Sequence, residues 1–364
     1  MDTRNMTLIS AATLEDLTRD IAPPSETWRQ KARLHLDTLT KPIGSLGRLE
    51  DLAAQMVAIR QERFAEPVSK AVYVFAADHG VTAEGVSAYP REVTHQMVLN
   101  FLAEGAAINV LARLHGVTLS VIDVGIDADL KDAPGLLHRK IRRGTRNMLK
   151  EAAMSEEEVR QALTAGAQLG ADAAATGRTL IAIGEMGIGN TTAASAITCA
   201  ITGASAAIAT GLGTGIPGEV HAHKVRVVEA VVSKHFGSAT VASPLEILRC
   251  VGGLEVAAMA GMVLAAARHR LAIVVDGFIS TAAAALAVAI EPNVHGYLIA
   301  GHRSQEPGHA LLLDHLKLAP ILTLAMRLGE GTGAVLAMPI VESAISLYTQ
   351  MATFTSAGVS GATR

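Results

Sequence analysis

The 364-residue sequence has few aromatic side chains, few cysteines and almost no net charge. Aromatic residues make up 3% of the chain, which leaves few rings on which the bases of a nucleic acid could stack. The formal net charge of −3 also argues against a nucleic-acid partner or an anionic membrane surface. Cys199 and Cys250 stand alone, without metal-ligand spacing, so we expect buried thiols in a reducing compartment.

Long apolar segments of the kind that enter membranes are also scarce. Residues 1–20 include acidic side chains and no long apolar stretch, so we expect no secretory signal and a cytoplasmic protein. Residues 186–218 carry no formal charge. They are nevertheless rich in Asn, Ser, Thr, Gly and Pro, a composition that disfavours a transmembrane helix, and we expect no membrane partner.

Small apolar residues are abundant and fall into alternating segments. Apolar residues make up 50% of the chain, and there are 33 glycines, a composition that suits close packing of helices on a sheet. The length suits one large domain with a smaller one, or two domains. From residue 70 onward, short β-rich runs alternate with helical runs. The β-rich runs are KAVYVFAADHG, VTLSVIDVG, LIAIGEMG, LAIVVDGF and HGYLIAGHRS.

This alternation predicts an α/β fold with a parallel sheet and right-handed crossovers. Each run ends in conspicuous polar or glycine residues, among them Asp78, Glu185 and Asp276. Ligands of such sheets collect beyond the carboxyl ends of the strands, and these polar residues would lie there. The pattern therefore indicates an enzyme.

The region before the sheet, residues 14–65, is predicted to be helical, with a break at the Ala-Pro-Pro-Ser sequence of residues 22–25. Within this region, KPIGSLGRLEDLAAQ joins a Lys-Pro and glycine loop to leucines at helical intervals. The segment fits a simple helix start. Lys41 and Arg48 on a rigid loop also leave a phosphate-binding or interface role open.

Residues 179–195, TLIAIGEMGIGNTTAAS, predict a strand, a glycine turn and the start of a helix. Gly187 and Gly189 allow a sharp turn close to a ligand, and residues 190–192 offer side-chain oxygens for an N-cap. Such a helix N-terminus favours phosphate. The spacing is neither that of a P-loop nor that of a Rossmann fingerprint, and it also fits an ordinary tight turn. Because Glu185 would repel a phosphate, we expect it to face another part of the substrate or a backbone donor.

Two further loops carry candidate binding residues. GLGTGIPG is a second glycine-rich loop, and Lys224 follows it in a helix of mixed charge. Two glycine loops and one lysine suit a nucleotide monophosphate. GVSAYP contains Ser87, and this loop could line a pocket or only connect two elements.

Near the end of the chain, MRLGEGTGA places Glu330 between glycines and between two apolar segments. One interpretation is a solvated loop carboxylate. The other is a general base held by a stiff backbone, with a pKa that apolar neighbours would raise towards neutrality.

GHRSQEPGH raises the question of a metal site. His302, Glu306 and His309 would share one face of a continuous helix. A Pro-Gly pair between Glu306 and His309 breaks such a helix, so we expect no metal. His221 and His223 are two residues apart and would lie on divergent helix faces, which favours surface positions.

Taken together, these motifs resemble one family. They are KPIGSLGRLE, AADHGV with GVSAYP, GEMGIGNTT, GLGTG, VVDGFIS, GHRSQEPGH and RLGEGTGA. The family is that of the nicotinate-nucleotide:dimethylbenzimidazole phosphoribosyltransferases of cobalamin nucleotide-loop assembly. The resemblance implies an enzyme that forms α-ribazole 5′-phosphate and nicotinate from nicotinate mononucleotide and 5,6-dimethylbenzimidazole, with small molecules as partners and no cofactor.

The resemblance also implies a three-layer αβα fold, with a mainly parallel, doubly wound, Rossmann-like sheet in residues 66–320. Residues 1–65 and 321–364, from the two chain ends, would form a small helical domain. Because the family is homodimeric, the resemblance implies a homodimer here.

Candidate site residues follow from the same motifs. Glu330 matches the family's proposed general base, and Ser87 resembles its base-pocket serine. The residues around the nucleotide would be Glu185, Gly187, Gly189, Asn190, Thr191, Gly213, Thr214, Gly215, Lys224 and Ser304. The family has a glutamine shortly after the base-pocket serine, and here His95 and Gln96 are both candidates for it.

Without the resemblance, two other classes of protein would fit the same pattern. One is another nucleotide-handling α/β enzyme, such as a nucleoside phosphorylase or an acyltransferase. The other is a non-catalytic nucleotide sensor, which would bind the mononucleotide, release nothing and not need Glu330.

Overall fold

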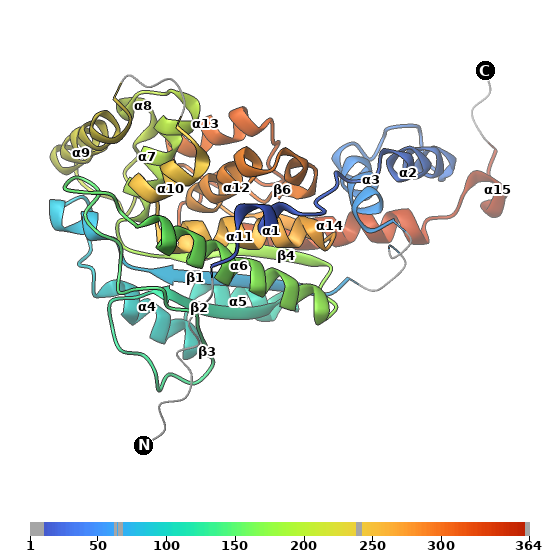
Figure 1. Ribbon diagram of the computed structural model, residues 1–364. Helices are drawn as coiled ribbons and strands as arrows, with labels where there is room; N and C mark the ends of the chain where they lie inside the picture. The colour runs from blue at the N-terminus through green and yellow to red at the C-terminus, as the bar shows by residue number, and fades with distance from the viewer. Residues whose placement is uncertain (1–10, 62–63, 65–67, 238–241, 361–364) are drawn as a thin grey trace.

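The computed structural model describes residues 11–61, 64, 68–237 and 242–360. Its strands are β1 (Lys70–Ala77), β2 (Thr118–Gly125), β3 (Leu136–His138), β4 (Leu180–Met186), β5 (Ala272–Val275) and β6 (Leu298–Ala300). They form one parallel sheet in the order β3-β2-β1-β4-β5-β6 (Figure 1). The predicted parallel α/β sheet is confirmed.

The helices occupy most of the remaining described chain. Before the sheet lie α1 (Leu14–Thr18), α2 (Glu26–Thr38) and α3 (Arg48–Arg60). Next come η2 (Gly80–Glu84), α4 (Val93–Leu102), α5 (Ala107–Leu114), α6 (Glu156–Ala175), α7 (Asn190–Thr202), α8 (Ala206–Ala209) and α9 (Gly218–Phe236). The last are α10 (Pro244–Val251), α11 (Leu254–Arg268), α12 (Phe278–Ile290), η3 (Pro292–Tyr297), α13 (Pro307–Leu316), α14 (Thr332–Gln350) and α15 (Phe354–Ala357).

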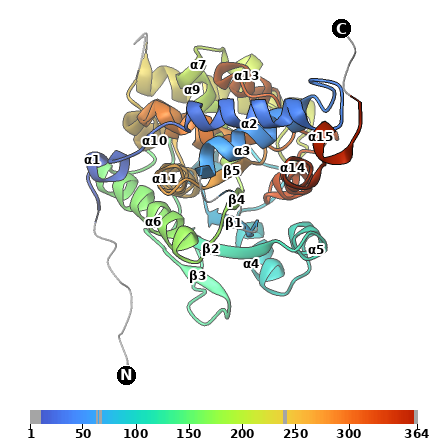
Figure 2. The ribbon, with the colours of Figure 1, turned by 90° about the vertical axis from the view of Figure 1, so that its right-hand side faces the viewer.

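Helices cover both faces of the sheet. On one face, α11 and α12 pack against the strands and α6 packs against α11. On the other face lie α4, α5 and α14 (Figure 2). These three layers confirm the αβα, doubly wound arrangement that the resemblance implied, and they explain the apolar character of the central strands, which are buried from both sides.

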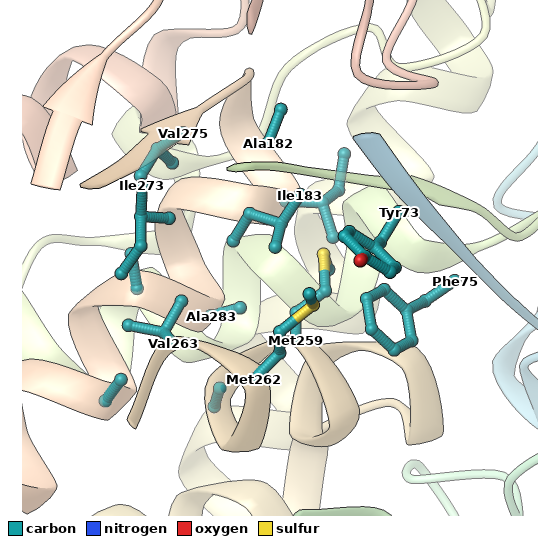
Figure 3. Close-up of a cluster of buried hydrophobic side chains, with 14 of the residues drawn as sticks. Tyr73, Phe75, Ala182, Ile183, Met259, Met262, Val263, Ile273, Val275 and Ala283 are labelled. Carbon is teal, nitrogen blue, oxygen red and sulfur yellow. The ribbon is translucent and has the colours of Figure 1, made fainter. Parts of the chain in front are cut away.

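The main core lies between the sheet and α11. Tyr73 and Phe75 from β1 point towards Met259 and Met262 from α11, and Ile183 from β4 lies beside them (Figure 3). The helices α6 and α11 approach so closely that a Cβ on Gly166 would collide with the carbonyl of Ala258. The abundance of small residues therefore serves the close packing that the composition predicted.

One strand was not predicted. β3 spans only Leu136–His138 and pairs with residues 121–123 of β2. Its three residues are too few to produce an apolar run that stands out in the sequence.

The predicted helices before the sheet are confirmed, and the break at residues 22–25 precedes α2, where Ser25 is the N-cap. Lys41 is buried and forms a 2.9 Å ion pair with Glu50 of α3, which favours a structural role over phosphate binding. α3 packs on α14, which also contacts β4 and β5. The division into a small helical and a large α/β domain stays a prediction.

Two described helical segments are long and apolar enough to cross a membrane by length and composition, a test that core helices of soluble proteins also pass. They are residues 93–114 and α14. The first consists of α4 and α5 with a break between them, and half of the most apolar window of α14 is buried. The uncharged residues 186–218 contain α7 and α8, of 13 and 4 residues.

Candidate active site

The candidate residues gather at the carboxyl ends of the strands. Because β1 lies between β2 and β4, the strand order reverses between β1 and β4, and ligands of open α/β sheets bind at such a point. Asp78 and His79 follow β1, Glu185 lies near the end of β4, and Asp276 follows β5. All four are buried.

The first glycine turn rests on a buried ion pair. A Cβ on Gly187 would lie 3.4 Å from the His79 ring, and one on Gly189 would lie 3.2 Å from the His79 Cβ. His79 Nε2 lies 2.6 Å from Glu255 Oε1. Burial lowers the pKa of His79, but the charge and hydrogen bond of Glu255 outweigh this effect and the pKa is raised. The His79–Glu255 ion pair thus packs against the glycine turn at Gly187 and Gly189.

Glu185 faces the helix that follows this turn. The Asn190 side-chain amide donates a hydrogen bond to Glu185 Oε2. Burial, followed by the charges of Asp276 and Glu255, raises the pKa of Glu185 to about 8. The described partner of Glu185 is a side-chain amide rather than a backbone donor. The alternative that Glu185 faces another part of the substrate stays a prediction.

The expected N-cap was wrong. Gly189, in the left-handed conformation with φ +96°, is the N-cap of α7, and no side chain caps the helix. Asn190 instead binds Glu185, and Thr191 accepts a hydrogen bond from Lys224. These polar side chains connect neighbouring motifs rather than ending their own helix.

Lys224 of α9 joins the two glycine turns. Its Nζ donates to Thr191 Oγ1 (2.8 Å) and to the Gly211 carbonyl (3.4 Å). Burial lowers the pKa of Lys224 to about 8, against an opposing contribution from Glu306. The Gly213 N–H donates to Glu306 Oε1 at 2.8 Å, so this N–H is already bonded within the protein.

The rest of the second loop contacts two more motifs. The Ala88 N–H donates to Thr214 Oγ1 (3.1 Å), whose oxygen lies 3.4 Å from Ser87 Oγ. Gly215 has φ +90°, and Arg327 donates to the Gly213 carbonyl at 2.9 Å. Ser304 Oγ accepts the Glu306 N–H at 3.3 Å. The nucleotide candidates therefore form one connected group.

Glu330 lies in a strained loop at the start of α14. Gly329, Glu330 and Gly331 have φ values of +85°, +63° and +85°, which is uncommon for a glutamate. The Glu330 carboxyl is buried, and its Oε2 has no hydrogen-bond partner among the described residues. Burial raises the pKa of Glu330, the backbone N–H of Ile108 lowers it, and the charge of Asp276 raises it again, with a net upward shift. This environment fits the general-base interpretation better than a solvated carboxylate.

The Glu330 loop lies directly against the first glycine turn. A Cβ on Gly184 of β4 would be only 2.5 Å from the Gly331 nitrogen, and one on Gly329 would collide with Glu185 Oε1. Motifs almost 150 residues apart in sequence thus meet at one end of the sheet.

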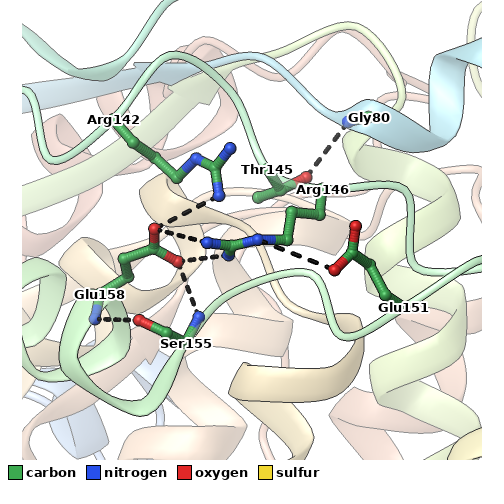
Figure 4. Close-up of polar contacts among 7 residues, drawn as sticks. All are labelled: Gly80, Arg142, Thr145, Arg146, Glu151, Ser155 and Glu158. Carbon is green, nitrogen blue, oxygen red and sulfur yellow. Dashed lines mark hydrogen bonds and ion pairs between the residues drawn. The ribbon is translucent and has the colours of Figure 1, made fainter.

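A polar network borders this end of the sheet. Arg142 and Arg146 both bind Glu158, at 3.3 and 2.6 Å, while Thr145 accepts the Gly80 N–H at 3.2 Å (Figure 4). The network anchors the segment before α6 to the turn after β1.

Comparisons with known proteins identify the family. Residues 21–359 match a family model described as a phosphoribosyltransferase. A nicotinate-nucleotide–dimethylbenzimidazole phosphoribosyltransferase of Geobacter sulfurreducens is 50% identical over 93% of this chain and 96% of its own. The enzyme of that name from Chloroflexus aurantiacus is 49% identical over 93% and 96%. The chain belongs to the nicotinate-nucleotide–dimethylbenzimidazole phosphoribosyltransferase family. The solved structure of the enzyme of that name from Thermus thermophilus is 46% identical, covers 93% of this chain and 100% of its own, and has a TM-score of 0.87.

The predicted family and fold are therefore confirmed, while the roles of individual residues in this phosphoribosyltransferase stay predictions. His95 is half-buried and Gln96 exposed on α4. Among the described residues, no hydrogen bond links either of them to another candidate. Ser87 is bonded to the second glycine loop, but no described contact joins it to Glu330.

Three acidic residues have positions in this site that the sequence predicted only in part: Glu255 was not predicted, Glu306 was considered only as a metal ligand, and Asp276 was predicted only to lie at the end of its strand. Glu255 supports the first turn, Glu306 binds the second loop and Asp276 binds the start of α14. Glu255 stands at the start of α11, whose later residues are apolar up to the final Arg268, and an isolated acid in such a segment was the available signal.

Several of the described histidines, among them His221, His223 and His309, are used in hydrogen bonds. No group of three His, Cys, Asp or Glu residues within the described ranges could hold a metal ion. His309 accepts the Ser304 N–H at 3.0 Å, and burial lowers its pKa to about 3. α13 begins at Pro307 with Glu306 as its N-cap, so no continuous helix carries His302, Glu306 and His309, in agreement with the predicted break. His221 and His223 are half-buried, with Nε2 2.9 and 2.7 Å from backbone carbonyls, so the expected surface positions were only partly correct.

Proposed function

We propose that this chain transfers the 5-phosphoribosyl group of nicotinate mononucleotide to 5,6-dimethylbenzimidazole. The products would be α-ribazole 5′-phosphate and nicotinate. Family membership and the names of the relatives support this activity. The mechanism depends on one observation above all, a buried Glu330 carboxyl with an unpaired oxygen beside the Glu185 turn.

The leaving group is already activated in this reaction. The pyridine nitrogen of nicotinate mononucleotide is positively charged while bonded to ribose, and it becomes neutral when it departs with the bonding electrons. The departure therefore needs no additional acid. A carboxylate nearby would not oppose it.

The nucleophile is an imidazole nitrogen of the benzimidazole. As this nitrogen bonds to C1′, the bond from C1′ to the pyridine nitrogen breaks, and the N–H on the other imidazole nitrogen becomes strongly acidic. Glu330 would take that proton, a step that typically contributes about 10² to 10⁴ in rate. Attack opposite the departing pyridine inverts C1′ and converts the β-riboside into an α-linkage.

The connected group around Lys224 would hold the 5′-phosphate. Lys224, Thr191 and Ser304 provide a buried cation and two hydroxyls from three motifs. The Gly213 N–H is already bonded to Glu306, so we assign the phosphate contacts of this loop to its other residues. Fixing the phosphate would set the position of C1′, and positioning supplies much of the remaining acceleration.

We further propose that the protein is a cytoplasmic homodimer whose two chain ends form a small helical domain. Leu99 of α4 and Val110 and Leu114 of α5 are exposed apolar side chains on neighbouring helices, which is typical of a protein contact. Light scattering should give twice the mass of one chain. A monomer at micromolar concentration would contradict the dimer.

The activity is tested by incubating nicotinate mononucleotide with the benzimidazole and measuring nicotinate by chromatography. We expect release only when both substrates are present. Glu330→Gln should fold, bind both substrates in calorimetry and lose at least about 100-fold in kcat. A variant that keeps more than about a tenth of the wild-type rate would reject Glu330 as the base. Binding of the mononucleotide without any release would instead indicate a sensor.

A further inference from the structure

Asp276, in the VVDGFIS motif, has no role in the mechanism above. It follows β5 and is 1% exposed. Its Oδ2 accepts the Gly331 N–H at 3.1 Å, and its Oδ1 accepts the Ala334 N–H at 2.9 Å. These N–H groups belong to the first turn of α14, where no helical carbonyl is available to accept them. Asp276 thus ties the end of β5 to the residue that follows Glu330.

A charged residue at this position carries a cost that a neutral cap would avoid. Serine, threonine or asparagine can cap a helix, whereas Asp276 adds a buried charge close to two other acids, Glu185 and Glu330. Burial raises the pKa of Asp276, and His302, whose Nε2 lies 3.7 Å from Asp276 Oδ1, acts against this shift. The two N–H donors facing its two oxygens disfavour a carboxyl proton, because that proton would point towards a donor.

The dipole of α14 indicates a role for the charge of Asp276. Glu330 lies immediately before the N-terminus of α14, and the positive end of a helix stabilises a carboxylate. A carboxylate stabilised in this way is a weak base. An anion hydrogen-bonded to the first turn of the helix counteracts the positive end of the helix dipole, and the carboxylate is then a stronger base.

We propose that Asp276 is a positioning residue for Glu330, which fixes the first turn of α14 and offsets the positive end of this helix so that Glu330 remains able to accept a proton. The inference rests on the proposed role of Glu330 as general base. It assigns to the VVDGFIS motif the task of setting the position and basicity of an acid more than 50 residues away in the sequence.

The groups that face Glu330 agree with this role. Asp276, after β5, raises the pKa of Glu330, whereas the Ile108 N–H, in the first turn of α5, lowers it. Glu185, at the end of β4, lies against the neighbouring Gly329. Burial raises the pKa of Asp276, whereas His302, after β6, and the backbone N–H groups of α14 favour its charged form.

The test is the pH dependence of kcat/KM for Asp276→Asn in the full-length enzyme. A general base acts when deprotonated, so activity falls on the acidic side of its pKa. Removal of the Asp276 charge should lower the pKa of Glu330. The acidic limb, which is the fall of kcat/KM at low pH, should then move to lower pH by about one unit. Asp276 also raises the pKa of Glu185. If the acidic limb reflects the titration of both Glu330 and Glu185, it should therefore still move to lower pH. The plateau kcat should fall at least about threefold, since the base is weaker.

A matched control separates charge from mechanical support. Thr332 Oγ1 donates to the Gly329 carbonyl at 2.8 Å, so Thr332→Val loosens the same loop without changing any charge. It should lower kcat and leave the acidic limb in place. If Asp276→Asn behaves like Thr332→Val, Asp276 is only a structural cap and the inference is overturned.

Two further variants keep the test decisive. His302→Gln leaves both cap hydrogen bonds but removes the group that favours the charged form of Asp276, so the limb should move in the same direction by a smaller amount. If Asp276→Asn does not fold, an unmoved limb in His302→Gln overturns the inference. Near wild-type activity of Glu330→Gln would instead reject Glu330 as the general base. The Asp276 and His302 variants test only the role of Asp276, so the two failures are distinguishable.

Discussion

Replacing Gly184 by alanine should disable catalysis without removing any functional side chain. Gly184 lies in β4 beneath the loop that carries Glu330. A Cβ there would be 2.5 Å from the Gly331 nitrogen, 2.6 Å from the Glu330 carbonyl carbon and 2.7 Å from its oxygen. All three atoms belong to the backbone, so they cannot rotate away as the end of a side chain would.

The size of the effect follows from these distances. Ordinary contact begins at 3.4 Å, so the closest pair of atoms must separate by about 0.9 Å. Gly184 lies inside the sheet, paired with Val74 in β1, whereas Glu330 lies in a loop outside the strands that is fixed by local hydrogen bonds, such as Gly331 N–H to Asp276 and Thr332 Oγ1 to the Gly329 carbonyl. We therefore expect the Glu330 loop to move. A misplacement of about 1 Å can cost about 100-fold in rate, and overpacking costs about 1–3 kcal/mol of stability.

The assay is steady-state release of nicotinate, with thermal unfolding measured in parallel. We expect kcat to fall by about two orders of magnitude, with little change in the KM of nicotinate mononucleotide, because the Lys224 group is built from other segments. Gly218→Ala is the control, since a Cβ at Gly218 meets no atom within 4 Å. A folded Gly184→Ala variant with at least about half of the wild-type kcat would refute this reasoning, because the expected loss is far larger.

Three further predictions follow from the charged groups. Because burial lowers the pKa of Lys224 to about 8, the lysine loses its charge above that pH; we expect the KM of nicotinate mononucleotide to rise there, and Lys224→Met to raise it at all pH values. Glu185 has its pKa raised from 4.5 to about 8 on folding, so the folded state binds more protons between these values. Its contribution to stability is complete below pH 4.5 and is lost towards pH 8, and denaturant titrations of Glu185→Gln should show a slope against pH that is less negative by up to about 1.4 kcal/mol per unit. Dialysis against EDTA should leave kcat unchanged, and a loss restored by Mg²⁺ would reject a mechanism carried by Glu330 alone.

The strands and their polar ends could be predicted because of simple physical constraints. A strand buried on both faces needs an almost continuous apolar run, as in residues 180–183. Polar residues directly after such runs then lie at one edge of a parallel sheet. This reasoning places Asp78, Glu185 and Asp276 together from the sequence alone.

The supporting contacts could not be predicted in the same way. Glu306 was considered only as a metal ligand, because nothing in its sequence indicates that the Gly213 N–H lies 2.8 Å away. The N-cap assignment of residues 190–192 failed because Asn190 binds Glu185 and Thr191 binds Lys224, and both partners come from other elements. Local sequence shows which groups can form hydrogen bonds, whereas tertiary packing decides which partner is reached.

The helix α14 begins two residues after Glu330 and contains 19 residues, including Pro339, so it is about 28 Å long. Its far end lies beside α3, and the Tyr348 carbonyl is 3.0 Å from His35 Nε2 of α2. Glu330 therefore lies just before one end of α14, whose other end contacts the helices of the N-terminal region (Figure 1). The packing of α2 and α3 and the position of the Glu330 loop thus depend on the same helix.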